Sequence, residues 1–288
     1  MQAANREPRR FSVAIPASVV SDTPHLREKT AKLGSIARAC SIFGVNEIIV
    51  YPDNPQLSQE TDAKFCAEIL EYLETPQYLR KRLFKLSPEL RFTGILPPLQ
   101  TPHHYVPRSR SAVKMGDLRQ GIITSRSGQS LKIDAGLEET VSTTGNNRTG
   151  ERVTLRLVKV DGELQGEIVD ASKISIYWGY RVTRTKFKLA STLEKERFDL
   201  KIGTSRFGVQ LQEVRPKVSD SLKISNSIMV AFGSPKMGLN EILCQEGKNP
   251  GNVFDFFINT VPQQHTATVR TEEAVFISLG ILNVMRHG

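Results

Sequence analysis

The stretches that decide the fold are Ser227-Ile-Met-Val-Ala-Phe-Gly-Ser-Pro235 and Phe254-Asp-Phe-Phe-Ile-Asn-Thr-Val-Pro262. Each begins as a short, apolar, β-prone run and stops at residues that cannot continue a strand, Gly233-Ser-Pro in the first and Asn259-Thr-Val-Pro in the second. Loops at the carboxyl ends of parallel strands form the usual ligand crevice of an α/β sheet. The pattern therefore predicts either a ligand site at these two loops or a pair of ordinary strand-to-helix turns.

Outward from these stretches, the chain alternates between strands and helices. Apolar, strand-like runs lie at residues 12–15, 47–51 and 198–202. Helical patterns, the last of them short and basic after Thr75-Pro76, lie at residues 24–43, 61–73 and 77–86. A final helix at residues 274–285 is apolar on nearly all sides, which suits either burial or dimerisation. These elements predict an α/β domain built from two discontinuous pieces, residues 1–95 and 190–288.

The intervening segment, residues 96–189, has a different pattern. Short β-like stretches separated by turn-rich pieces lie at residues 117–125, 131–135, 153–160, 167–171 and 175–184. Between Tyr105 and Ala190 there are fifteen Lys or Arg against nine Asp or Glu, so this segment carries six of the nine excess positive charges of the chain. Five short strands and a basic surface predict a small, inserted, RNA-binding β-barrel.

Aromatic and basic residues cluster at the end of this segment. Strand alternation would place Trp178 and Tyr180 on one face and Tyr177 on the other, which leaves Trp178 either in the barrel core or facing RNA. The candidates for phosphate contacts are the basic residues that follow, namely Arg181, Arg184, Lys186 and Lys188.

Composition limits the class of protein. The 288 residues are 39% hydrophobic, which is enough for a packed core, and the net charge of +9 favours polyanionic partners. The three cysteines, Cys40, Cys66 and Cys244, form no CxxC pair, so we expect neither a zinc site nor a disulfide framework, and a reducing compartment. The polar, basic N-terminus and the absence of a long apolar run lead us to expect a soluble protein without a membrane span.

Four blocks of sequence, in order along nearly the whole chain, resemble one family. They are Phe11-Ser-Val-Ala-Ile-Pro16, the stretch from Ile36 to Tyr51, Arg91-Phe-Thr-Gly-Ile-Leu-Pro-Pro-Leu99, and the stretch from Thr268 to Asn283 beside the two loops quoted above. Together they resemble the SPOUT class of S-adenosylmethionine-dependent RNA methyltransferases, in the archaeal and eukaryotic branch that carries an OB-like insertion.

This resemblance implies a fold and a cofactor site. The fold would be a mostly parallel sheet flanked by helices, with a trefoil knot in its C-terminal part and an inserted OB-like barrel. The cofactor would be S-adenosylmethionine, bound by backbone at Gly233, Asn259 and Thr260 and at Arg206 in the Gly-Thr-Ser-Arg-Phe-Gly loop that ends at Gly208. The family commonly has arginine one position later in that loop. The class works as a homodimer and needs no metal.

The segment before the last helix carries a further candidate. Thr271 is expected to be the N-cap of that helix, with Glu272 and Glu273 in the first turn, where the helix dipole favours anions. Arg270 lies just before the helix and is the candidate catalytic residue, placed to hold the phosphate of the methyl acceptor. His265 replaces a glycine usual in the family and is treated as an incidental loop residue.

The sequence therefore predicts an RNA methyltransferase acting on ribosomal RNA, with a pyrimidine base nitrogen as the favoured acceptor and a ribose 2′-OH as the alternative. A non-catalytic, RNA-binding ribosome-assembly factor that keeps the fold is the rival from another class. The expected location is cytoplasmic in a prokaryote and nuclear or nucleolar in a eukaryote.

Overall fold

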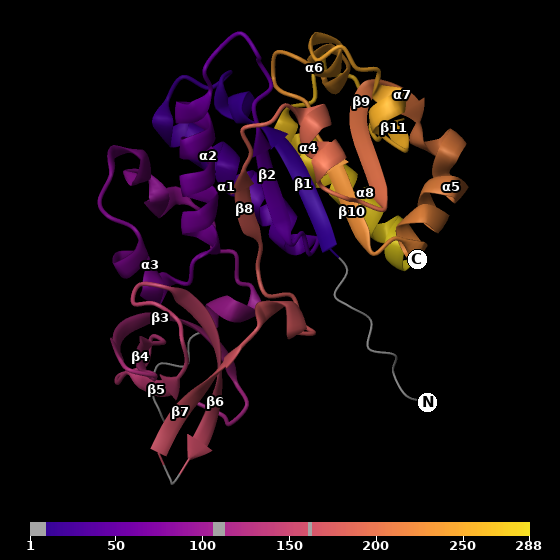
Figure 1. Ribbon diagram of the computed structural model, residues 1–288. Coiled ribbons are helices and arrows are strands. Elements are labelled where there is room, and N and C mark those ends of the chain that lie inside the picture. Colours follow the sequence, from indigo (N-terminus) through magenta and orange to yellow (C-terminus); the bar gives the residue numbers. More distant parts are fainter. Residues whose placement is uncertain (1–9, 106–112, 161–162) are drawn as a thin grey trace, which may run out of the picture. The chain divides into compact units, whose positions relative to one another are not determined.

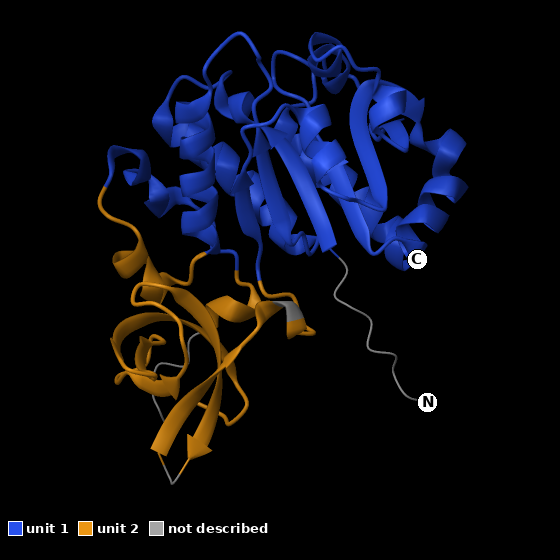
Figure 2. Ribbon diagram, viewed as in Figure 1, with its two compact units in different colours: residues 1–74, 87–99, 179–288 blue, residues 75–86, 100–178 orange. Residues whose placement is uncertain are grey.

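The computed structural model describes residues 10–105, 113–160 and 163–288. The chain divides into two compact units (Figure 2). The sheet unit comprises residues 1–74, 87–99 and 179–288, and the barrel unit comprises residues 75–86 and 100–178. We had expected the insertion to span residues 96–189. In the structure, residues 75–86 group with the barrel, whereas residues 179–189 group with the sheet.

The sheet unit is built on a six-stranded sheet in the order β11-β9-β10-β1-β2-β8, with every neighbouring pair parallel (Figure 1). Its strands are β1 (Arg10–Pro16), β2 (Glu47–Tyr51), β8 (Arg181–Arg184), β9 (Leu200–Gln210), β10 (Ser227–Ala231) and β11 (Phe256–Asn259). The expected parallel sheet is confirmed. Its carboxyl-terminal edge brings together the loops that follow β10 and β11.

Helices cover both faces of this sheet, which is why its central strands are buried along nearly their whole length. Val13 and Ile15 of β1 lie in one hydrophobic cluster and Ala14 lies in the other. The first cluster includes residues of α1 (Leu26–Ile42), α2 (Glu60–Glu74), α5 (Leu211–Ile224) and α8 (Thr271–His287). The second includes residues of α4 (Leu189–Lys195), α6 (Leu239–Gln245) and α7 (Pro250–Val253).

Short 3₁₀ turns connect several of these elements. They are η1 (Ala17–Val20), η2 (Pro88–Leu90), η3 (Thr93–Ile95), η4 (Pro102–His104) and η6 (Ala171–Lys173). The segment around η3 is held on α1, because Arg38 donates hydrogen bonds to the carbonyls of Pro98 and Leu99 at 3.1 and 2.7 Å.

The barrel unit contains a closed barrel in the strand order β3-β4-β5-β7-β6. Its strands are β3 (Leu118–Ser127), β4 (Ser130–Asp134), β5 (Val141–Thr144), β6 (Arg152–Val160) and β7 (Glu163–Val169). Inward-facing residues such as Ile123, Leu131 and Leu155 form its core. The expected five-stranded barrel is confirmed, although the sequence pattern missed the short, polar strand β5.

Helix α3 (Gln77–Leu83) is packed on this barrel. The Tyr78 hydroxyl donates a hydrogen bond to the carbonyl of Gln120 at 2.9 Å, and Arg82 forms an ion pair with Asp134 at 2.5 Å. Gly136 has a positive φ of 70°, and a Cβ at this position would overlap the Tyr78 ring. Burial raises the pKa of the Tyr78 hydroxyl, which keeps it protonated as a donor.

The prediction of a barrel strand at residues 175–184 is wrong. Only residues 181–184 form a strand, β8, and it pairs with β2 at the edge of the parallel sheet. Gly179, with a φ of 88°, interrupts the extended backbone just before it. The strand alternation inferred for Trp178 and Tyr180 therefore does not apply. Tyr180 is buried in the sheet unit, where its hydroxyl donates to the carbonyl of Leu70 at 2.9 Å.

Strand β8 is attached to the sheet through the carboxylate of Glu47 on β2. One Glu47 oxygen accepts hydrogen bonds from Arg181 and Thr183 of β8, both at 2.9 Å. The other accepts from Ser12 at 2.9 Å and from Arg10 at 2.5 Å on β1. The side chain is only 2% exposed. Burial alone would raise the pKa of this carboxyl, but the two guanidinium groups outweigh it and the pKa lies below its usual value.

Replacing Glu47 by Gln is expected to lower the free energy of unfolding by about 2–4 kcal/mol at pH 7, because two arginines lose a buried counter-ion. A depressed pKa contributes stability that is present above the unfolded pKa, about 4.3, and is lost as pH falls through the folded pKa. The difference between wild type and variant should therefore shrink below about pH 4. Urea unfolding of wild type and variant, at pH 7 and again below about pH 4, measures this difference in the free energy of unfolding.

Glu60→Gln is the matched control. Glu60 also pairs with an arginine of β8, Arg184, at 2.8 Å, but this pair lies on the surface. It should cost less than about 1 kcal/mol. Equal losses in the two variants would show that the Glu47 network contributes nothing beyond a surface pair.

Candidate functional site

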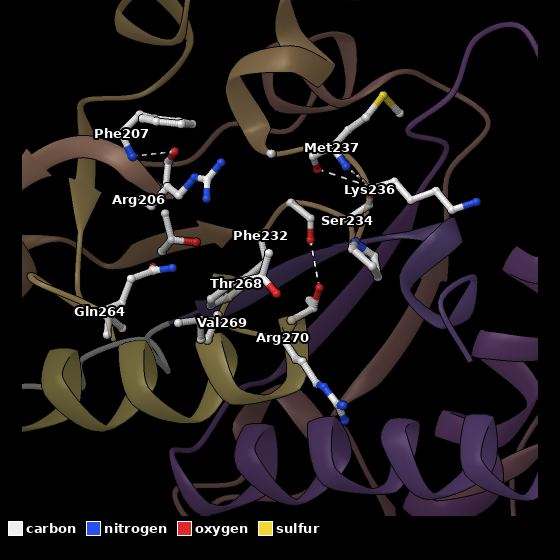
Figure 3. A pocket seen from close by; sticks show the side chains of 18 of the residues that line it. Arg206, Phe207, Phe232, Ser234, Lys236, Met237, Gln264, Thr268, Val269 and Arg270 are labelled. Carbon is white, nitrogen blue, oxygen red and sulfur yellow. Dashed lines mark hydrogen bonds between the residues drawn. The ribbon is translucent and has the colours of Figure 1, made fainter. Parts of the chain in front are cut away.

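A pocket of about 410 Å³ lies in the sheet unit among the loops that follow β10 and β11. Strand β9 contributes residues 204–207 and the segment leading into α8 contributes residues 268–271 (Figure 3). The structure brings together at this pocket all the residues proposed for the cofactor and for catalysis, which are Arg206, Gly233, Asn259, Thr260 and Arg270. Residues more than sixty positions apart in the sequence therefore share one cavity.

The first loop, residues 232–238, folds back tightly on itself. The amide of Ser234 donates to the carbonyl of Met237 at 2.8 Å, and the Ser234 hydroxyl accepts from the amide of Met237 at 3.1 Å. A Cβ on Gly233 would lie 3.0 Å from backbone atoms of Met237, Gly238 and Leu239. Glycine is required here because the loop itself leaves no room, which is a reason independent of any ligand.

In the second loop, the side chains of Asn259 and Thr260 bind other parts of the protein. Asn259 accepts from the amide of Val261 at 2.9 Å and donates to the carbonyl of Arg206 at 3.1 Å. The hydroxyl of Thr260 is buried against that of Ser278 on α8, at 2.8 Å. The backbone of this loop, rather than these side chains, is what the pocket offers to a ligand.

Arg206 connects β9 to the segment before α8. Its guanidinium donates to the carbonyl of Ala267 at 3.1 Å and lies over the ring of Phe207, 4.6 Å from its centroid. Phe207 is 65% exposed at the pocket. Arginine at this position therefore closes one side of the cavity even though it stands one place earlier than is usual in the resembling family.

Helix α8 begins one residue earlier than expected. Its N-cap is Arg270, and Thr271 is the first helical residue. The Thr271 hydroxyl donates to the carbonyl of Gly233 at 3.1 Å, which joins the helix to the first loop. Glu273 accepts a hydrogen bond from the amide of Arg270 at 2.9 Å, so this acidic residue is used in capping. In Figure 3, the Arg270 side chain extends away from residues 234–237.

Charged groups of both signs surround the pocket. Arg206, Lys236 and Arg270 supply positive charge, and Asp22 and Glu241 supply negative charge. The sequence analysis missed Lys236, Asp22 and Glu241. Lys236 stands directly after the quoted loop Gly233-Ser-Pro, and Asp22 follows the strand at residues 12–15. In a parallel sheet, both positions fall at the same edge, and this topological signal would have found them.

Asp22 is not a free carboxylate. Its two oxygens lie 2.7 and 2.9 Å from the Nζ atom of Lys32, a side chain that is only 5% exposed. Burial would raise the pKa of Asp22, but the Lys32 ammonium outweighs it and holds the pKa below its usual value. Lys32 Nζ also lies 3.3 Å from Glu272 of α8. This lysine ties α1, the loop of Asp22 and α8 together beneath the pocket.

The residues predicted to contact RNA do not lie on the barrel. Arg181 is paired with Glu47 and Arg184 with Glu60, whereas Lys186 and Lys188 are exposed just after β8. Trp178 does lie on the barrel unit, half buried, and its indole N–H donates to Thr154 at 3.0 Å. The interpretation of Trp178 as a packed barrel residue accounts for its contacts.

The positive charge of the barrel unit comes mainly from its helical segment. Residues 75–86 contain four basic and no acidic residues, whereas residues 100–178 contain eleven basic and nine acidic residues. Of the excess of six counted between Tyr105 and Ala190, residues 105–178 supply two charges, and the other four are Arg181 and Arg184 in β8 and Lys186 and Lys188 just after it.

Within the described ranges, no cluster of three or more His, Cys, Asp or Glu side chains has the arrangement of a metal site. Cys40 and Cys66 are buried, and burial raises the pKa of both thiols well above the usual range. Cys244 is exposed. None of the helices in the described part of the chain combines the length and apolarity needed to span a bilayer.

The fold and the pocket agree with a family match. Residues 10–282 match the model of a family described as "Putative RNA methyltransferase". The match covers nearly all of the sheet unit and the barrel unit, and the chain belongs to this family of RNA methyltransferases.

Individual relatives carry more specific names. A protein of Homo sapiens named 28S rRNA (uridine-N(3))-methyltransferase is 33% identical over 96% of this chain and 78% of its own length. The protein of the same name from Drosophila melanogaster is 32% identical over 96% of this chain and 62% of its own. An uncharacterized protein of Halobacterium salinarum is 32% identical over 95% of this chain and 98% of its own.

Replacing Thr271 by Val is expected to loosen the first loop, because the partly buried carbonyl of Gly233 loses its donor. The free energy of unfolding should fall by about 1–3 kcal/mol. Hydrogen exchange measured by mass spectrometry should quicken in residues 232–238, and more there than in the barrel strands. Thr271→Ser keeps the hydroxyl and is the control. If the serine variant exchanges as fast as the valine variant, the hydrogen bond does not hold this loop.

Proposed function

We propose that this protein transfers a methyl group from S-adenosylmethionine to N3 of a uridine in ribosomal RNA. The observation that carries the proposal is the combination of a loop-walled pocket with 33% identity, over almost the whole chain, to a protein named for that reaction. The relatives' names favour a base nitrogen over the ribose 2′-OH as the acceptor. A non-catalytic assembly factor remains the rival, and the experiment below separates the two.

The residues present fit S-adenosylmethionine. The cavity volume of about 410 Å³ lies within the range of small-molecule sites, about 300–1,000 Å³. Backbone edges at Gly233, Asn259 and Thr260 offer N–H and C=O groups for the adenine and ribose. Carboxylates and cations on the rim suit the charged amino-acid end. When bound, S-adenosylmethionine supplies an already activated methyl group.

The chain's own part in the reaction is positioning and electrostatics. N3 of uracil carries a proton that must pass to solvent water, so negative charge develops on the base. Arg206, Lys236 and Arg270 provide cations that stabilise this charge in a partly enclosed site. Asp22 is a poor proton acceptor, because Lys32 holds its pKa low. The electrostatic role is therefore assigned to the three cations rather than to Asp22, and Arg270 keeps its proposed place beside the acceptor.

We also propose the finer features of the fold. The barrel is OB-like, which its closed order β3-β4-β5-β7-β6 supports. The C-terminal part is a trefoil knot, a proposal supported by the hydrogen bond that joins the start of α8 to the loop of Gly233. A crystal structure in which residues 259–271 pass outside the loop after β10 would contradict the knot.

A second copy of the chain is proposed to cover the outer faces of α5 and α8. These helices pack together, with the Ser219 hydroxyl donating to the carbonyl of Met285 at 3.0 Å. They leave Ile224 and Val284 exposed by 78% and 64%. Val284→Asp should convert a dimer, twice the 32.2 kDa chain mass, into a monomer in light scattering. Leu57, in the loop between β2 and α2, is an apolar residue that is 67% exposed away from these helices, and Leu57→Asp should stay dimeric. A monomeric wild type would contradict the proposal.

Gly233→Ala is expected to weaken S-adenosylmethionine binding by at least about tenfold, or roughly 1.4 kcal/mol, because the backbone of residues 237–239 must move. Isothermal titration calorimetry measures this affinity. Gly94→Ala is the matched control, since nothing lies within 4 Å of the added carbon. If the folded wild type does not bind S-adenosylmethionine at high micromolar concentration, the pocket has another ligand.

The reaction itself is tested with ribosomal RNA from cells that lack the gene. With labelled S-adenosylmethionine, the wild type should place label on a uridine at a position that stops reverse transcription, because N3 lies on the pairing edge. Gly233→Ala should place less label. Label in a nucleotide that resists alkaline cleavage would indicate the 2′-O reaction instead. RNA binding that persists without any methyl transfer would establish the assembly-factor alternative.

A further inference from the structure

An aromatic residue is presented to solvent at the carboxyl end of strand β8. Phe187 is 48% exposed, yet its backbone is fixed on both sides. Its amide donates to the hydroxyl of Thr185 at 3.1 Å, and its carbonyl accepts from the hydroxyl of Thr192 at 3.1 Å. The main chain that carries the ring is therefore held in place, although leaving the ring half exposed forgoes hydrophobic stabilisation.

Positive charge surrounds this ring. The Nζ atom of Lys195 lies 3.0 Å from the ring centroid, so a cation supports one face of the ring. Lys186 and Lys188 flank it in sequence and are both exposed. A fixed aromatic ring among lysines is the combination that binds single-stranded nucleic acid, with stacking for the base and cations for the phosphates. An acidic protein surface would use the lysines but would leave the ring without a matching group.

The ring lies on the same edge of the sheet as the pocket. All six strands are parallel, so the end of β8 and the end of β10 point the same way. Three strand spacings of about 4.8 Å separate β8 from β10, or roughly 14 Å. The Tyr51 hydroxyl at the end of β2 donates to the carbonyl of Phe232 at 2.6 Å, which links the two halves of this edge.

The helix that follows Phe187 is also linked to the pocket loop. Glu246, at the end of α6, accepts hydrogen bonds from the amides of Leu189 and Ala190 in the first turn of α4, at 3.0 and 2.9 Å. Helix α6 itself follows directly after the loop of residues 232–238. Phe187 and the pocket are thus held at fixed positions on one unit of the protein.

We propose that Phe187 stacks on an unpaired base of the RNA, one that lies within a few nucleotides of the nucleotide to be methylated, while Lys186 and Lys188 contact its phosphates. This rests on the proposed function, which makes RNA the substrate. It assigns part of RNA recognition to the sheet unit rather than to the barrel alone. It also explains why a phenylalanine that is 48% exposed is held by hydrogen bonds on both sides of its backbone.

The test compares variants at this position. Binding of a fluorescein-labelled twelve-residue oligouridylate is followed by fluorescence anisotropy, beside a double-stranded RNA of the same length. Phe187→Leu should weaken oligouridylate binding about tenfold, within the range for one base on an aromatic ring, and Phe187→Trp should stay within about twofold of wild type. Duplex binding should change less than about twofold. Ile42→Ala, at another exposed apolar residue of the sheet unit, is the control and should change neither.

Two further measurements distinguish a loss of base stacking from a loss of phosphate contacts and from damage to the pocket. Lys186→Glu and Lys188→Glu should each reduce the slope of log affinity against log salt by about one. S-adenosylmethionine affinity in Phe187→Leu should equal that of wild type. Oligouridylate binding that is unchanged in Phe187→Leu, or lost equally for the duplex, would overturn the proposal. A wild type that binds oligouridylate through Phe187 but transfers no methyl group would instead overturn the proposed reaction and leave the stacking site standing.

Discussion

The pocket depends on the hydrogen bonds that fasten the first half of helix α8 to two strand-end loops. Thr271 binds the carbonyl of Gly233 in the loop after β10, and Ser278 binds Thr260 in the loop after β11. The loop residues 232–238 have no regular hydrogen-bonding pattern of their own beyond one tight turn. A free loop would cost conformational entropy each time a ligand ordered it. Because the loop is attached to a buried helix, its conformational entropy is lost during folding, before any ligand binds.

Local features of the sequence were enough to predict much of the sheet unit. Apolar runs such as residues 228–232 stop at glycine or proline, so both the strands and their loops are visible without a structure. The resemblance then supplied Gly233, Asn259 and Thr260. Strand β8 was misassigned because a short polar strand at a sheet edge has no pattern of its own. Its place depends on Glu47, more than 130 residues away, and distant pairing of this kind cannot be seen in local periodicity.

Net charge was a weaker guide than its location. Several basic residues that had suggested an RNA-binding barrel are occupied within the protein, Arg181 by Glu47 and Arg184 by Glu60. Among the described residues, no ion pair holds Lys186 or Lys188. A count of charges by sequence segment does not distinguish the paired arginines from these lysines. Only the lysines can release counter-ions from RNA without first breaking an internal pair. The structure separates them.

The bonds that stabilise strand β8 also position the residues proposed to bind RNA. Arg181 and Thr183 fix β8 through the buried carboxylate of Glu47, and the chain runs directly from β8 into Thr185, Phe187 and the lysines beside it. An edge strand has a neighbour on one side only, so side-chain bonds to β2 replace the second neighbour that a central strand would have. If Glu47 were protonated, the two arginines would lose their counter-ion, and β8 would keep only its ladder and the surface pair of Arg184 with Glu60. The position of the exposed ring therefore depends on the buried carboxylate of Glu47 as well as on the hydrogen bonds of Thr185 and Thr192.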